Sequence, residues 1–236
     1  MRYQRHFATI GTRCRTAAAT RGGGSVQTIL IANPKGGSGK TTLATNIAGW
    51  LAGKRQKVVL EDRDAQQSAT QWLARRPALF PAVSGVGADA KKKDLDAQWL
   101  VVDSAAGLHG DDLRSAIRIA DVMLVPVSPS AFDMAATQRF LQAIADYKAV
   151  KAGDLAVGLV GMRVDPRTRS AGELEAFLES FEFPVVTHLR DTQVYVHCAR
   201  DGACVFDLPR SRAEQDWEQW KPLTRWIARH AAVRNA

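Results

Sequence analysis

The sequence predicts an α/β protein built on a single doubly wound, mostly parallel sheet with helices on both faces. Short apolar runs of strand length recur along the chain, and amphipathic stretches of helix length separate them. The 236 residues are 46% hydrophobic and 24% charged, which suits one substantial soluble core. No apolar run approaches the roughly 18 residues of a membrane-spanning helix. We therefore expect no transmembrane segment.

The predicted strands are β-rich runs bounded by turn residues. The first run is ended by Pro34 and Gly36. The six runs are residues 28–32, 58–60, 99–102, 122–125, 155–160 and 184–188. Strands that alternate with helices lie parallel, which places ligand sites beyond their carboxyl ends. Residues 77–96 are rich in breakers and include three lysines, so we expect a solvated surface excursion there.

The first 25 residues differ in composition from the rest of the chain. They hold five arginines, no acid and a terminal glycine run, so we expect a disordered basic extension before a domain at residues 26–236. A transit peptide, a start codon assigned too early and a nucleic-acid-binding arm stay open as alternatives. Because these arginines carry much of the net charge of +8, the body is only mildly basic, and DNA binding would depend on a local patch.

The cysteines give no sign of a covalent or metal framework. Cys14, Cys198 and Cys204 are odd in number and lack the paired spacing of a zinc site. This pattern argues against disulfides and suits a reducing cytoplasm.

A glycine-rich loop follows the first predicted strand and precedes a helix predicted over residues 41–52. Glycines here let successive backbone N–H groups converge on phosphate oxygens, and the helix N-terminus adds a favourable dipole. Lys40 would supply a cation to the outer phosphates, and Thr41 would offer its hydroxyl to magnesium. The predicted nucleotide-binding residues are Lys35, Gly36, Gly37, Ser38, Gly39, Lys40, Thr41 and Thr42.

The loop departs from the common P-loop pattern, because Pro34 stands where glycine is usual and Lys35 adds a second lysine. The run from Asn33 to Thr42 resembles the deviant Walker A motif of the ParA/MinD family of partition and positioning ATPases. The resemblance extends over roughly residues 26–230. It implies ATP and Mg²⁺ as ligands, and an ATP-dependent homodimer in which Lys35 reaches the partner's nucleotide. Lys35 and Lys40 are therefore both predicted to be catalytic.

Carboxylates follow the second predicted strand in a segment similar to the family's Asp-x-Asp-Pro-Gln element, with Ala65 in place of its proline. The resemblance assigns Asp64 to the attacking water, as a catalytic residue, and places Asp62 near the magnesium shell. Glu61 is expected to face solvent or cap the turn. The alternative is that this acidic loop caps a helix that begins near Gln66.

A further carboxylate, Asp103, ends the third predicted strand and resembles the family's Walker B aspartate. With Thr41 and Asp62 it completes the predicted magnesium site, because a hard dication prefers oxygen ligands. Gly107 would let the following loop move with the γ-phosphate.

Two later segments, residues 126–130 and 190–195, also resemble small partition ATPases. They are expected to shape the dimer surface and the nucleotide rim, or to be plain loops in which Asp191 or Thr192 caps a helix.

The C-terminal stretch has an apolar stripe at helical spacing. Its members are Trp217, Trp220, Leu223 and Ile227, and Pro222 interrupts the pattern. We expect this stripe to pack on the body, with a membrane anchor as the alternative. The polar face is expected to carry Glu214, Asp216 and Glu218.

The resemblance implies a cytoplasmic, nucleoid-associated switch. ATP would join two protomers, and the dimer would bind DNA non-specifically. A small partner protein would stimulate hydrolysis, which would release the dimer from the DNA. The cargo would be a plasmid, a chromosome locus or a protein microcompartment. DNA contacts are predicted at Arg163, Arg167 and Arg169.

Other members of the superfamily give rival interpretations. A MinD-like membrane switch and a metabolic ATP-dependent ligase stay as alternatives. An iron–sulfur reductase relative would need cysteines near the switch region, and the sequence has none between Cys14 and Cys198. The 25 residues before the domain are too few for the helix-turn-helix domain of large partition ATPases, so the small type is expected.

Overall fold

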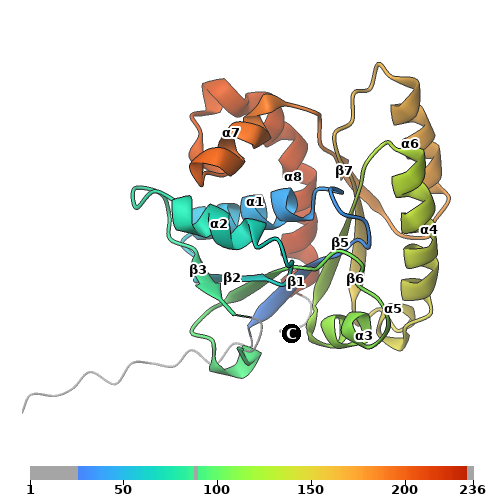
Figure 1. Ribbon diagram of the computed structural model, residues 1–236, viewed down its shortest axis with the longest axis horizontal. Coiled ribbons are helices and arrows are strands. Elements are labelled where there is room, and N and C mark those ends of the chain that lie inside the picture. The colour runs from blue at the N-terminus through green and yellow to red at the C-terminus, as the bar shows by residue number, and fades with distance from the viewer. Residues whose placement is uncertain (1–25, 88–89, 233–236) are drawn as a thin grey trace, which may run out of the picture.

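The computed structural model describes residues 26–87 and 90–232, and the predicted basic extension lies outside the described residues. At its centre is a sheet of seven parallel strands in the order β3-β2-β4-β1-β5-β6-β7 (Figure 1). The strands are β1 (Gln27–Ile31), β2 (Val58–Asp62), β3 (Ser84–Val86), β4 (Trp99–Asp103), β5 (Val122–Val127), β6 (Ala156–Gly161) and β7 (Val185–His188). The predicted doubly wound sheet is confirmed, because parallel strands alternate with crossover helices along the chain.

Helices cover both faces of the sheet (Figure 1). One face carries α1 (Lys40–Gly53), α2 (Ser68–Arg75), α7 (Gln193–Asp201) and α8 (Arg210–Ala232). The other carries α3 (Gly110–Ile119), α4 (Ala131–Ala145), α5 (Lys148–Lys151) and α6 (Arg169–Glu179). Two short 3-10 turns, η1 (Lys92–Asp94) and η2 (Val205–Asp207), complete the elements.

The hydrophobic core is divided by the sheet into two clusters. Along β1, Ile29 and Ile31 belong to the cluster under α1 and α8, whereas Leu30 belongs to the cluster under α4 and α6. This alternation follows from the two-residue period of a strand. Burial on both faces explains why the strands read as nearly continuous apolar runs. The loop after β1 therefore starts from a central strand whose residues 29–31 are fully buried.

The predicted excursion at residues 77–96 contains a strand that the sequence did not indicate. Ser84–Val86 forms β3, which pairs with β2 at the edge of the sheet. The strand is only three residues long and mostly exposed, so it has no apolar alternation to reveal it. Of the three lysines expected to be solvated, Lys91 and Lys93 are exposed, whereas Lys92 contacts the Ile119 carbonyl and Asp121.

The C-terminal helix packs on the body, as expected. Trp220, Leu223 and Ile227 are fully buried in the cluster under α1. Pro222 lies inside α8 without ending it. The assignment of Asp216 to the polar face was wrong, because Asp216 is fully buried and forms an ion pair with Arg190 at 2.8 Å. The apolar face of α8, which could have served as a membrane anchor, is therefore buried against the body of the protein.

Candidate nucleotide-binding site

The loop between β1 and α1 is held from beneath by a buried side chain. The Asn33 amide donates to the Pro126 carbonyl at 2.7 Å and to the Thr137 hydroxyl at 2.9 Å. Its oxygen accepts the Lys35 backbone N–H at 2.8 Å. Because Pro126 lies in β5 and Thr137 lies on α4, the loop is fastened to the neighbouring strand and helix. Satisfied buried polar contacts of this kind fix a loop in one conformation.

Two glycines give this loop its shape. Gly37 has φ +77° and Gly39 has φ +99°, values that side-chain-bearing residues rarely adopt. A Cβ atom on Gly39 would also lie 2.8 Å from Cε of Met162. The loop therefore turns tightly into α1 and leaves its backbone open to a ligand.

The two lysines of the loop have different surroundings. Lys40 is 6% exposed, and its Nζ donates to the Lys35 carbonyl at 3.0 Å. Burial lowers the pKa of Lys40, and the negative charges of Asp103 and Asp64 oppose that shift. Lys35 is exposed. One lysine thus lies within the loop, and the other faces outward from it.

Thr41 and Asp103 meet where α1 begins and β4 ends. The Thr41 hydroxyl donates to Asp103 Oδ2 at 2.7 Å. Asp103 is fully buried, and its Oδ1 has no hydrogen-bond partner among the described residues. Burial raises the pKa of Asp103 to about 7, and the nearby Asp62 charge adds to the increase. A hydroxyl beside a carboxylate with an unpaired oxygen fits a magnesium ion that keeps several waters.

Asp62 pairs in register with Asp103, but its oxygens are already engaged. One accepts the Asp64 N–H at 3.1 Å and the other accepts the Thr70 N–H in α2 at 2.8 Å. Asp62 thus caps α2, as the capping alternative expected. The magnesium role of Asp62 stays a prediction. The expectation for Glu61 was wrong, because Glu61 is 3% exposed and forms an ion pair with Arg63 at 2.8 Å. Glu61 lies in β2, an interior strand between β3 and β4, so its side chain lies on a covered face of the sheet.

Asp64 links its own loop to the loop after β4. Its carboxylate accepts the Gln66 N–H at 2.9 Å and the Ala106 N–H at 3.1 Å. Gly107, with φ +75°, donates its N–H to the Pro34 carbonyl at 2.8 Å. The loop after β4 therefore contacts both the Asp64 loop and the phosphate loop, as a nucleotide-sensing segment would.

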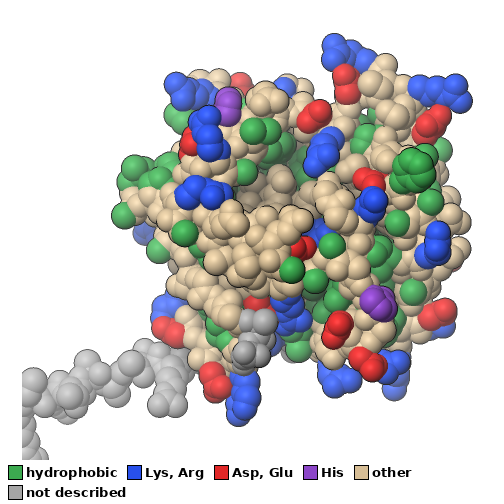
Figure 2. Space-filling view, viewed as in Figure 1, with side chains coloured by type: hydrophobic (Ala, Val, Ile, Leu, Met, Phe, Trp, Pro, Cys, Tyr) green, Lys and Arg blue, Asp and Glu red, His purple; other side chains and the backbone are tan. Residues whose placement is uncertain are grey.

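A pocket of about 570 Å³ opens beside these residues, within the size range of nucleotide sites. Figure 2 shows the hollow, with Lys and Arg side chains around it. The lining includes Gly36, Gly37, Gly39, Lys40, Thr41, Thr42, Asp64 and Ala106, and adds Asn46, Gln71, Arg75, Arg163, Tyr195 and Arg200. The structure thus brings most of the predicted phosphate-loop residues and Asp64 to one cavity.

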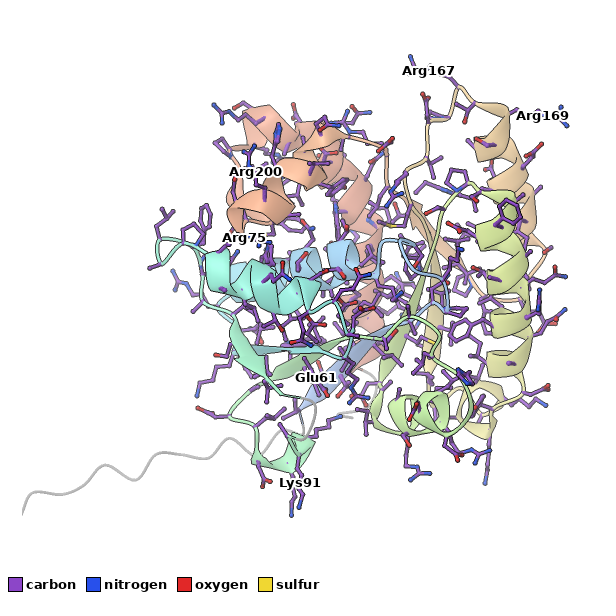
Figure 3. The ribbon with its side chains drawn as sticks, in the orientation of Figure 1. Glu61, Arg75, Lys91, Arg167, Arg169 and Arg200 are labelled. Carbon is purple, nitrogen blue, oxygen red and sulfur yellow. The ribbon has the colours of Figure 1, made fainter. Side chains whose placement is uncertain are left out.

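Sequence reasoning did not find the arginines in the α2 and α7 wall of this pocket. Arg75 lies on α2 and Arg200 on α7, near one another in Figure 3, and Arg75 donates to the Ala199 carbonyl at 3.2 Å. Nothing in the local sequence separates them from other surface arginines. Tyr195 lies in a segment expected at the nucleotide rim, and Thr192 caps α7 by accepting the Val194 N–H. The capping alternative therefore holds for Thr192.

The three arginines predicted to contact DNA do not form one cluster. Arg163 lines the pocket. Arg167 forms an ion pair with Asp165 at 2.7 Å, and Arg169 forms one with Glu173 at 2.9 Å. Figure 3 shows Arg167 and Arg169 at a corner away from Arg75 and Arg200.

In residues 26–87 and 90–232 no helix is long and apolar enough to cross a membrane. Within the same residues, no group of three or more His, Cys, Asp or Glu side chains could hold a metal by itself. A magnesium ion here would therefore depend on Thr41, the carboxylates, water and phosphate oxygens together.

The parallel sheet, the loop between its central strand and α1, and the Thr41–Asp103 contact define a P-loop nucleotide-binding protein. Residues 29–201 match the family described as the CobQ/CobB/MinD/ParA nucleotide-binding domain. The chain belongs to this family, and the resemblance seen in the deviant loop is confirmed.

Relatives and solved structures agree with this placement. The chain is 29% identical over 199 residues to maintenance of carboxysome distribution protein A of Halothiobacillus neapolitanus, covering 80% of this chain and 91% of that protein. It is 30% identical to the protein ParA of Rhizobium radiobacter, covering 67% and 77%.

A plasmid partition protein of Borrelia burgdorferi bound to AMPPNP superposes with a TM-score of 0.65 at 16% identity, covering 86% of this chain and 100% of the other. The septum site-determining protein MinD of Pyrococcus horikoshii, complexed with Mg-ADP, superposes with a TM-score of 0.62 at 19% identity, covering 80% and 92%. Identities this low show the shared fold alone.

Proposed function

We propose that this chain is an ATP-dependent dimerising switch that binds nucleoid DNA non-specifically and positions or segregates a cargo. The cargo would be a plasmid, a chromosome locus or a protein microcompartment, and hydrolysis stimulated by a small partner protein would reset the switch. The observation that carries this proposal is the pair of lysines in one phosphate loop, Lys40 buried and Lys35 exposed. The relatives named for carboxysome distribution and partition support the same function.

The geometry suggests how each residue would act. The backbone N–H groups of residues 36–42 and Lys40 would hold the triphosphate. Thr41 and Asp103 would hold Mg²⁺, which supplies charge neutralisation between the outer phosphates. Asp64, already within the pocket, would orient the attacking water.

Lys35 would complete the site from the second protomer. Its exposure leaves it free to reach across a dimer, where its charge would stabilise the transferring phosphate, as an arginine finger does. In this proposal the protein works in the cytoplasm on the nucleoid, and DNA contacts are made to phosphates, with Arg167 and Arg169 as candidates.

The test is DNA retention by the purified full chain with ATP, ADP or no nucleotide, across a salt series. We expect binding only with ATP, and a steep loss of affinity as salt increases. Asp64→Ala should keep ATP-dependent DNA binding but lose hydrolysis, which would trap the bound state. Lys40→Ala is the matched control, because it should lose nucleotide and DNA together.

Equal DNA binding in all three nucleotide states would contradict the switch. ATP-dependent binding to anionic liposomes instead of DNA would favour the membrane alternative. The structure does not favour that alternative, because the apolar face of α8 is buried in the core. Turnover of a small substrate without dimerisation would favour the ligase alternative.

A further inference from the structure

A second cavity opens at the edge of the sheet opposite the nucleotide site. It has a volume of about 660 Å³ and lies among the last turn of α4, α5, the start of β6, the loop before β7 and the end of α8. Parallel strands all begin at one edge of their sheet, so this cavity, the amino-edge groove, lies far from the loops that follow the strands. The groove is therefore separate from the nucleotide pocket.

The lining of the amino-edge groove is largely apolar and only partly covered. Phe181, Phe183 and Trp226 are half-buried there, and the Trp226 ring lies 4.4 Å from that of His230. The apolar lining residues include Leu141, Val150, Val157, Phe181, Phe183 and Trp226. A segment with aromatic and aliphatic side chains would bury apolar surface in this groove.

The rim of the groove carries carboxylates that lack a cationic partner. Glu182 lines the groove and is exposed, and Glu179 and Asp154 are exposed in the segments that adjoin it. In the described part of the chain, no salt bridge involves any of these three carboxylates. The lysine of the lining, Lys151, is paired with Asp146 at 3.0 Å. The groove therefore fits a segment that is both apolar and basic.

The basic extension of residues 1–25 joins the body at this same edge. Val26 packs against the core cluster under α4 and α6, and the Gln27 side chain donates to the Ala231 carbonyl at the end of α8. His230, the residue before Ala231, lines the groove. Only β5 separates β1 from β6, so the starts of β1 and β6 are roughly 10 Å apart. The 16 residues from Ile10 to Val26 can span up to about 50 Å, which is ample.

The composition of the extension complements the groove. Tyr3, Phe7 and Ile10 follow one another at spacings of four and three residues, which is the spacing of one helix face. Five arginines and no acid accompany them, which matches the free carboxylates of the rim.

We propose that the extension binds in the amino-edge groove of its own chain, with Tyr3, Phe7 and Ile10 on the aromatic lining and arginines beside Glu182. Attachment to Val26 gives the extension an effective concentration in the millimolar range, which favours its own groove over that of another copy. The proposal does not depend on the proposed function, because the nucleotide pocket lies at the other edge of the sheet.

The test uses the natural thiol of Cys14 to locate the extension in the full chain. Gln142 is exposed on α4 and lines the groove, so Gln142→Cys places a second thiol there. Burial raises the pKa of Cys198 to about 12 and also raises the pKa of Cys204, so neither thiol competes. With a mild oxidant, the disulfide from Cys14 to the introduced thiol should form at least about tenfold faster than in Gln138→Cys. Gln138 is the matched control, because it is exposed one turn earlier on α4 and outside the lining.

The apolar contact is tested in the same Gln142→Cys chain. Serine at the three apolar positions should remove the rate advantage, and the changes are Tyr3→Ser, Phe7→Ser and Ile10→Ser. Serine at three threonines of the extension should preserve it, and these control changes are Thr9→Ser, Thr12→Ser and Thr16→Ser. Glu182→Gln should slow the disulfide severalfold at low salt and have less effect at high salt.

The disulfides are identified by mass spectrometry after separation of single chains from linked pairs. Equal rates at positions 142 and 138 would overturn the proposal. Disulfides that link two chains would assign the groove to the extension of a second copy, which also overturns it. A rate advantage that survives the three apolar replacements would show that the aromatic lining does not bind the extension.

Discussion

The Thr41 hydroxyl donates to Asp103 Oδ2 at 2.7 Å, which joins the first turn of α1 to the last residue of β4. The two residues are 62 positions apart, and they meet because β1 and β4 are neighbours in a parallel sheet. A hydroxyl and a buried carboxylate are thus aligned at the edge where a phosphate loop opens.

Thr41→Val should remove the response of nucleotide binding to magnesium. Valine keeps the shape of threonine and removes the hydroxyl that would bind the ion and orient Asp103. We expect ADP affinity with magnesium to decrease at least about tenfold, with little change in the presence of a chelator. Calorimetry in both conditions measures this difference. Thr224→Val in α8 is the control, and a magnesium response like that of the original chain would remove Thr41 from the site.

Asp103→Asn should stabilise the nucleotide-free protein at pH 8. Because burial raises the pKa of Asp103 from 3.8 to about 7, the folded state holds a proton that the unfolded state releases between these values. Asp103 therefore lowers the free energy of unfolding progressively as pH rises from about 4 to 7, and the deficit is constant above that range. We expect a gain of roughly 2 kcal/mol at pH 8 and a much smaller gain at pH 5. Denaturant unfolding at both pH values measures it, and an equal gain at both would contradict the assignment.

Lys35→Ala and Lys40→Ala should have separable effects. Lys40 lies buried across the loop, so its loss should abolish tight ATP binding. Lys35 is exposed, so its loss should leave ATP binding by the monomer within about twofold but prevent ATP-dependent dimerisation. Light scattering with ATP, together with nucleotide titration, distinguishes the two. Survival of both dimerisation and DNA retention in Lys35→Ala would refute the proposed switch.

Asp207→Ala should destabilise the fold strongly. Its carboxylate contacts Arg76 at 2.9 Å, and the two side chains are 3% and 5% exposed. Removing one partner leaves a buried charge, so we expect a loss of about 3 kcal/mol or more in the free energy of unfolding. Asp96→Ala, which breaks the exposed pair with Lys57, should cost under about 1 kcal/mol. Comparable losses in the two variants would show that burial does not increase the contribution of the Arg76–Asp207 pair to the free energy of unfolding.

Local patterns predicted much of the architecture correctly. The apolar runs located all of the long strands, because burial on both faces leaves a continuous signal in the chain. They missed β3, whose three residues are too few for a period. They also misplaced Glu61 and Asp216. Each of these acids is buried because an arginine pairs with it, and local patterns do not show that pairing.

The sequence by itself determined the parallel α/β class, the phosphate loop with its two lysines, and the family, because each is written in residues adjacent along the chain. Only the tertiary structure decided which distant side chains share the pocket. Arg163, Arg200 and Arg75 come from three separate segments of the chain, and no local spacing connects them to the loop. The physical reason is that strand order, set by packing of the whole sheet, brings the ends of separate strands together.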